Sequence, residues 1–166
     1  MSSFDDVLTA NAAYAETFAD VGRTGRAARG LAVVTCMDSR ISPLDLLGLE
    51  DGDAKILRNA GAQVTDDVLR TLVLAVHLLD VTRVMVVAHT DCRMVAVTDA
   101  EIHQAMAEGA GIDTRSLDFR TIADQRSTLA ADVQRIRSYP YLPVGLPVTG
   151  CVYDVRTGRL EVAVPD

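Results

Sequence analysis

Residues 31–40 read LAVVTCMDSR, a short apolar run that ends in a cysteine and leads into charged residues. A second run, residues 83–89, reads RVMVVAH and continues through Thr90 and Asp91 to Cys92. Both runs are short and rich in Val, as are strands that are buried on both faces of a parallel sheet. The carboxyl ends of neighbouring parallel strands meet at one edge of the sheet, where open α/β folds place their sites. The polar residues after the two runs are therefore expected to converge.

The rest of the chain alternates strand patterns with helix patterns. This predicts an α/β fold with a central, mostly parallel β-sheet flanked by helices. Thr157 and Gly158 form a turn into residues 160–164, which predicts a C-terminal antiparallel edge strand. Ser42 before Pro43, and Thr65 before two aspartates, mark helix starts. Further strands are expected at 54–57 and around Cys151, and helices at 5–19, 43 onward, 65–79, 99–108 and 122–137.

Length and composition narrow the class of protein. A chain of 166 residues with 49% hydrophobic residues can bury the core of one domain, expected over residues 1–166. The net charge of −7 argues against a nucleic-acid surface. No apolar run reaches the length of a membrane span, and the first residues do not resemble a signal peptide. Three cysteines do not make a disulfide framework, so a reducing cytoplasmic location is expected.

Cys36, His89 and Cys92 are the candidate metal ligands. Two thiolates and one imidazole suit a tetrahedral Zn²⁺, and three protein ligands leave one position open, as in catalytic zinc sites. The alternative is that each cysteine simply packs as a small hydrophobic residue. That alternative is weakened because all three residues follow predicted strands and have acidic and basic neighbours.

The remaining cysteine and histidines are expected to lie outside this site. Cys151 falls in an apolar strand pattern and is interpreted as core packing, which is favoured over a role as fourth zinc ligand. His77 lies in the apolar helix pattern and is expected to be packed. His103 lies in a polar helix and is expected to be solvated.

Asp38 and Arg40 follow Cys36 closely enough to face the same crevice. A charge-assisted pair with Arg40 would keep Asp38 ionised. Asp38 could then orient a water at the metal, or bind the metal itself. The alternative is a surface ion pair without a role.

A third group of polar residues ends the second predicted strand. Arg58, Asn59 and Gly61 are candidates for binding an anionic substrate, because glycine permits a tight backbone with N–H groups that receive anions. The alternatives are an ordinary strand-to-helix turn and an ion pair between Arg58 and the acidic start of the next helix.

These motifs together resemble the β-class carbonic anhydrases. The resemblance rests on three motifs, which occur in the same order and at similar spacing in that family. They are Cys-x-Asp-x-Arg beginning at Cys36, Arg-Asn-Ala-Gly beginning at Arg58, and His-x-x-Cys beginning at His89. The similarity is strongest to short bacterial members of actinobacterial type, and it extends over nearly the whole chain.

The resemblance implies an enzyme, a carbonic anhydrase (carbonate dehydratase, a zinc lyase) for the reversible hydration of carbon dioxide to bicarbonate. It implies Zn²⁺ on Cys36, His89 and Cys92, with Asp38 and Arg40 as the catalytic dyad. It also implies that water is the fourth ligand in an open form and Asp38 in a closed, resting form. Finally, it implies a homodimer, possibly a tetramer, in which the helix at 5–19 embraces the partner.

Two alternatives remain open at this stage. Carbonyl sulfide and carbon disulfide hydrolases resemble the same family, so the substrate is not fixed by the motifs. A non-catalytic zinc-binding homologue is the other alternative. It is suggested by Arg93, which stands where the family usually has glycine after the second zinc cysteine.

Overall fold

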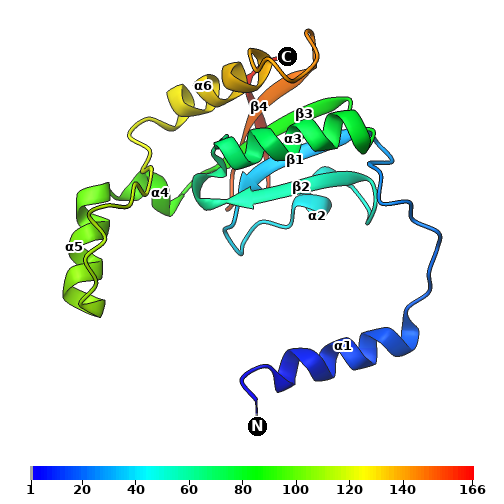
Figure 1. Cartoon of the computed structure of the whole chain (residues 1–166), viewed down its shortest axis with the longest axis horizontal. Coiled ribbons are helices and arrows are strands. Elements are labelled where there is room, and N and C mark those ends of the chain that lie inside the picture. The colour runs from blue at the N-terminus through cyan, green and yellow to red at the C-terminus, as the bar shows by residue number, and fades with distance from the viewer. Residues whose placement is uncertain (1) are drawn as a thin grey trace.

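A computed structural model describes residues 2–166, and its centre is a five-stranded sheet in the order β2-β1-β3-β4-β5 (Figure 1). The first four strands run parallel, and the fifth pairs antiparallel with the fourth, so the predicted fold class is confirmed. The strands are β1 (Leu31–Cys36), β2 (Ala54–Asn59), β3 (Arg83–His89), β4 (Val148–Tyr153) and β5 (Leu160–Val164).

The strand order brings distant segments together. Strands β1 and β3 are neighbours although β2 lies between them in sequence, and Thr35 is in register with Val87. Cys36 and His89 therefore end at the same edge of the sheet. This is the edge where polar side chains were expected to meet.

Helices cover the two faces of the sheet unequally. α3 (Asp66–Leu78) and α6 (Gln125–Arg137) pack on one face, and the short α2 (Pro43–Leu47) packs on the other. A hydrophobic core lies on each face of the sheet, and alternate residues of β1 contribute to the two cores. Ala32 and Val34 face α3 and α6, and Leu31 and Val33 face α2. The alternation follows from the two-residue repeat of a strand, whose side chains point to opposite faces.

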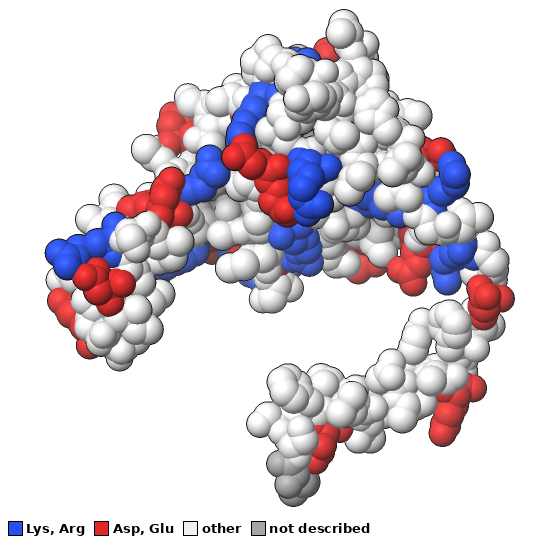
Figure 2. All heavy atoms as spheres, in the orientation of Figure 1, with Lys and Arg blue, Asp and Glu red and all other residues white. Residues whose placement is uncertain are grey.

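Two helices lie away from the sheet (Figure 1). One is α1 (Asp5–Thr17), which has no buried residue and exposes more than half of Val7, Leu8 and Tyr14. The charged side chains on α1 are all acidic, whereas both signs are mixed on the body of the molecule (Figure 2). The other is α5 (Asp99–Ala110), which follows the short α4 (Arg93–Ala96). No helix within residues 2–166 has the length and apolarity that a membrane crossing requires.

Some helix boundaries differ from those predicted from the sequence. The last helix begins at Gln125 rather than at 122, because the Asp124 side chain caps it by accepting a hydrogen bond from the Ser127 N–H at 2.7 Å. The first helix ends at Thr17 rather than at 19. Neither α4 nor the single 3₁₀ turn at Ala60–Ala62 was predicted, since both are too short to show a hydrophobic period.

Candidate metal centre

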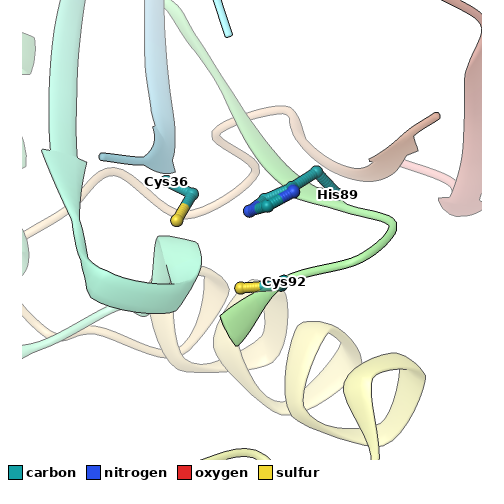
Figure 3. A group of neighbouring side chains, drawn as sticks. All are labelled: Cys36, His89 and Cys92. Carbon is teal, nitrogen blue, oxygen red and sulfur yellow. The ribbon is translucent and has the colours of Figure 1, made fainter. Parts of the chain in front are cut away.

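Cys36, His89 and Cys92 converge as predicted (Figure 3). Cys36 ends β1, His89 ends β3, and Cys92 is the N-cap of α4 after a two-residue turn. Their ligand atoms all lie within 4.8 Å of one another. All three residues are buried, with exposed fractions of 5%, 1% and 4%. Donor atoms from two strands and one helix start therefore surround a single point.

The imidazole of His89 is oriented for a metal. Its Nδ1 lies 2.9 Å from the Thr90 carbonyl oxygen, and a carbonyl only accepts, so Nδ1 carries the proton. Nε2 then presents a lone pair, and it is a buried side-chain atom without a hydrogen-bond partner in the described chain. A buried polar atom without a partner is costly unless something binds it. Together with two thiols, this donor set fits zinc.

Neighbouring groups stabilise a thiolate at Cys36. A hydrogen bond from Cys92 holds the pKa of the Cys36 thiol well below its usual range, although burial opposes this. The Gly61 N–H also donates to Cys36 Sγ at 3.4 Å. Burial lowers the pKa of His89, but Cys36, the Thr90 carbonyl and the Asp38 charge together outweigh burial and leave the pKa raised. The hydrogen bond between Cys92 and Cys36, together with burial, raises the pKa of Cys92, so Cys36 is the thiol of this pair that ionises first.

The loop after Cys36 is held by Arg58, whose Nε donates to the Cys36 carbonyl at 2.9 Å and whose Nη2 donates to the Asp38 carbonyl at 2.7 Å. The ion pair with Asp66 or Asp67 that was the alternative for Arg58 does not form. Asp66 pairs with Arg135 and Asp67 with Arg70. Arg58 therefore fixes the backbone that carries Cys36 and Asp38.

The other two candidate substrate residues lie at the adjoining turn. The Asn59 side chain binds the backbone of Gln63, accepting from its N–H at 2.9 Å and donating to its carbonyl at 2.7 Å. Gly61 has φ +83°, and a Cβ there would lie 3.0 Å from Ile122 Cδ1. Glycine is thus required by conformation and by space. These residues shape the turn beside Cys36, and their contact with substrate stays a prediction.

Asp38 and Arg40 form the expected pair. Arg40 Nη2 lies 2.7 Å from Asp38 Oδ2, and Arg40 Nε lies 2.9 Å from Asp38 Oδ1. These hydrogen bonds hold the pKa of Asp38 far below its usual range, so the carboxylate stays ionised. Asp38 Oδ2 is 3.9 Å from His89 Nε2. An ionised acceptor therefore lies directly beside the three donors.

Asp91 joins this group and was not predicted. Its carboxylate accepts a hydrogen bond from Arg40 Nη1 at 2.8 Å, and its carbonyl accepts one from Arg40 Nη2 at 3.0 Å. Gln125 was also missed: its Nε2 donates to the His89 carbonyl at 2.8 Å. The only sequence signal for Asp91 was its place between two candidate ligands, and Gln125 had none.

The residues that were set aside lie away from the centre. Cys151 is fully buried in the sheet core, as predicted. The prediction of a packed His77 was wrong, because His77 is exposed on α3 and its Nε2 contacts the Tyr141 carbonyl at 2.9 Å. His103 is half-buried rather than fully solvated, with Nδ1 2.9 Å from Thr114 Oγ1.

Arg93 causes no backbone strain. It is the first residue of α4, its side chain is exposed, and it is not among the described non-glycine residues with positive φ. Its charge contributes to lowering the pKa of Glu101, after the hydrogen bonds that Thr98 makes to that carboxylate. A glycine is therefore not required by conformation at this position.

Comparisons with known proteins agree with this geometry. The sequence profile of the carbonic anhydrase family matches residues 31–160. Beta-carbonic anhydrase 1 of Mycobacterium tuberculosis is 32% identical over 165 residues, which cover 99% of this chain and 100% of that protein. The crystal structure of a carbonic anhydrase from Streptococcus mutans superposes with a TM-score of 0.90 at 36% identity, covering 98% of each chain. A carbon disulfide hydrolase of Acidithiobacillus thiooxidans is 30% identical over 152 residues, covering 80% of this chain and 76% of that protein.

Proposed function

The chain belongs to the β-class of the carbonic anhydrase family, and from this premise we propose that it is a zinc enzyme for the reversible hydration of carbon dioxide to bicarbonate. The observation that carries the proposal is the buried cluster of Cys36, His89 and Cys92, in which His89 Nε2 has no hydrogen-bond partner among residues 2–166. The two thiolates and Nε2 would hold the metal. When bound, zinc supplies Lewis-acid chemistry that makes a water nucleophilic near neutral pH.

The chain's own residues position the attacking water. Asp38 accepts a hydrogen bond from the attacking water and so aims its oxygen lone pair at the carbon of carbon dioxide. Arg40 keeps Asp38 ionised and therefore an acceptor. As one C–O bond forms, the π pair of one C=O bond of carbon dioxide moves onto its oxygen, and a proton of the water leaves to solvent, which gives bicarbonate. The distance of 3.9 Å between Asp38 Oδ2 and His89 Nε2 supports this role, because it places the acceptor at the donor cluster.

Substrate binding is part of the same proposal. Arg58 and Gly61 both contact Cys36, through its carbonyl and its Sγ, and Asn59 holds the same turn, so the three residues are proposed to bind substrate there. Arg58 acts there through the backbone carbonyls that it binds, which keep Asp38 turned toward the site. The closed form, in which Asp38 becomes the fourth ligand, also remains a proposal.

We further propose that residues 1–166 form one domain that works as a cytoplasmic homodimer. Support comes from α1, which lies apart from the sheet and exposes apolar side chains along its length (Figure 1). Such a helix gains stability by packing on another surface rather than in water. A second copy of the chain would provide that surface.

The activity is tested by stopped-flow hydration of carbon dioxide with zinc-loaded protein, across neutral to alkaline pH. The wild-type protein is expected to hydrate carbon dioxide faster than the buffer alone. The Asp38→Ala variant is expected to keep its zinc and to lose this activity. A zinc-loaded protein without any rate would support the non-catalytic alternative.

Hydrolysis of carbon disulfide is the second candidate, favoured by the 30% identical hydrolase. It is tested on the same preparation by measuring the release of hydrogen sulfide. Sulfide release without hydration of carbon dioxide would replace the first proposal by the second.

A further inference from the structure

We propose that Asp91 is a positioning residue that holds the Arg40 guanidinium, so that Asp38 stays paired with Arg40 and leaves the fourth position of the metal open. The inference rests on the proposed function, because it assumes a metal between Cys36, His89 and Cys92.

The Arg40 guanidinium bridges the two loops that carry the metal ligands. On one side it donates to Asp38 from Nε at 2.9 Å and from Nη2 at 2.7 Å. On the other side it donates to the Asp91 carboxylate from Nη1 at 2.8 Å and to the Asp91 carbonyl from Nη2 at 3.0 Å. Asp38 alone could not fix Arg40 in space, because a pair on one loop can turn as a unit. Asp91 ties that pair to the loop between His89 and Cys92.

The backbone of Asp91 is shaped for this contact. Its φ is +57°, a left-handed conformation that few residues other than glycine adopt, and aspartate and asparagine tolerate it best. The turn is anchored on its other side: the Thr90 N–H donates to the Tyr153 carbonyl at 2.9 Å, and Thr90 Oγ1 accepts from the Val155 N–H at 3.2 Å. The left-handed residue thus presents its carboxylate and its carbonyl to the same guanidinium.

Holding Arg40 matters because Asp38 has two competing partners. Its Oδ2 lies 2.7 Å from Arg40 Nη2 and 3.9 Å from His89 Nε2, at the rim of the donor cluster. A carboxylate is itself a zinc ligand. If Arg40 were free to move, Asp38 could turn to the metal and block the position that water must take. With Arg40 held by Asp91, Asp38 stays paired with Arg40 and does not turn to bind the metal.

The test uses the full chain loaded with Co²⁺, whose visible spectrum reports its ligands, and thiocyanate as a probe for the open position. The variant is Asp91→Asn, since asparagine keeps the left-handed turn while losing the charge. Asp80→Asn is the matched control: Asp80 has φ +61° and pairs with Arg26 at 2.7 Å, distant from the site. We expect thiocyanate to bind Asp91→Asn about tenfold more weakly than wild type, and Asp80→Asn to bind it normally.

A double variant separates positioning from a general loss of structure. In Asp38→Ala with Asp91→Asn no carboxylate can turn to the metal, so thiocyanate affinity is expected to return to that of Asp38→Ala. Normal thiocyanate binding by Asp91→Asn overturns the inference, as does weak binding that persists in the double variant. Loss of Co²⁺ from Asp91→Asn also overturns it, because Asp91 would then support Cys92. Wild-type protein without a thiolate-to-cobalt absorption band would instead refute the metal centre and the proposed function with it.

Discussion

Each of the three donors is expected to be necessary for metal binding. Cys36→Ser, His89→Ala and Cys92→Ser should each lose most of the bound zinc, because two remaining protein ligands do not hold a tetrahedral metal. Zinc per protein, measured by plasma emission after dialysis, checks this. Cys151→Ala is the control: Cys151 is buried in the sheet core, and its variant should keep the metal. Full zinc in Cys92→Ser would refute the ligand assignment.

The donors themselves could be predicted from sequence, and their supports could not. Cys36 and His89 end apolar runs, and parallel strands end at a common edge, so their meeting follows from topology. Arg58 and Asp91 act through backbone carbonyls and a left-handed turn, and these depend on loop conformation that no residue pattern specifies. The hydrophobic period of α3 is clear from the sequence. It does not tell whether His77, at the border of the apolar face, is covered by the sheet or left exposed.

At the scale of elements, the contact between β4 and α6 depends on Gly150. A Cβ at Gly150 would lie 3.0 Å from side-chain atoms of both Leu129 and Val133 on α6. Gly150→Ala is therefore expected to lower the free energy of unfolding by about 1–3 kcal/mol through overpacking. Gly109→Ala is the control: Gly109 lies in α5 with open space around its Cα, and alanine there should stabilise by about 0.5–1 kcal/mol. Urea denaturation measures both, and equal stability of the two variants would contradict the packing argument.

Asp99 joins the start of α5 to the segment that returns from it. Its carboxylate accepts hydrogen bonds from Thr121 Oγ1 at 2.5 Å, from the Thr121 N–H at 2.9 Å and from the Phe119 N–H at 2.8 Å. The hydrogen bonds from Thr121, more than any other, lower the pKa of Asp99 to about 2. Because the folded pKa is depressed, the stabilisation is present above the unfolded pKa of about 3.9 and is lost as the pH falls through the folded value.

Wild type is therefore expected to be more stable than Asp99→Asn at pH 6. The difference in the free energy of unfolding should shrink between about pH 4 and pH 2, the unfolded and the folded pKa of Asp99. Urea denaturation of both proteins at each pH provides the measurement. A difference that is constant with pH would mean that the charge of Asp99 has no part in it.

Helices and strands could be predicted from sequence where the hydrophobic repeat is long. They were harder to predict where a capping side chain decides at which residue a helix begins. The sheet and α3 follow from apolar periodicity, and Thr65 caps α3 as predicted by accepting from the Val68 N–H. The start of α6 depended on Asp124, one of several polar residues in that region that were equally suited to cap a helix. A 3₁₀ turn at Ala60–Ala62 has no such signal, since its shape is set by the contacts of Gly61.

At the scale of the whole molecule, α1 is the helix whose apolar side chains stay exposed to solvent in a single chain. Leu8 and Tyr14 are 62% and 58% exposed, so an aspartate at either position should weaken a dimer that buries them. Light scattering on Leu8→Asp and Tyr14→Asp should show a mass closer to the monomer than wild type has. Thr9→Asp adds the same charge at an exposed position on the side of α1 away from Leu8 and Tyr14, and should leave the mass unchanged. Identical masses for all four proteins would refute the role of α1 in assembly.

The placement of β3 beside β1 also sets the order of events during folding. A chain emerging from the ribosome presents Cys36 first, and His89 and Cys92 only after β2 and α3 have been made. The three donors come together when β1 pairs with β3, a contact between distant segments whose loop-closure entropy must be overcome beforehand. A metal arriving earlier would meet at most two of its ligands. A metal that binds all three donors can therefore do so only after β1 and β3 have paired, and its binding would stabilise the completed sheet.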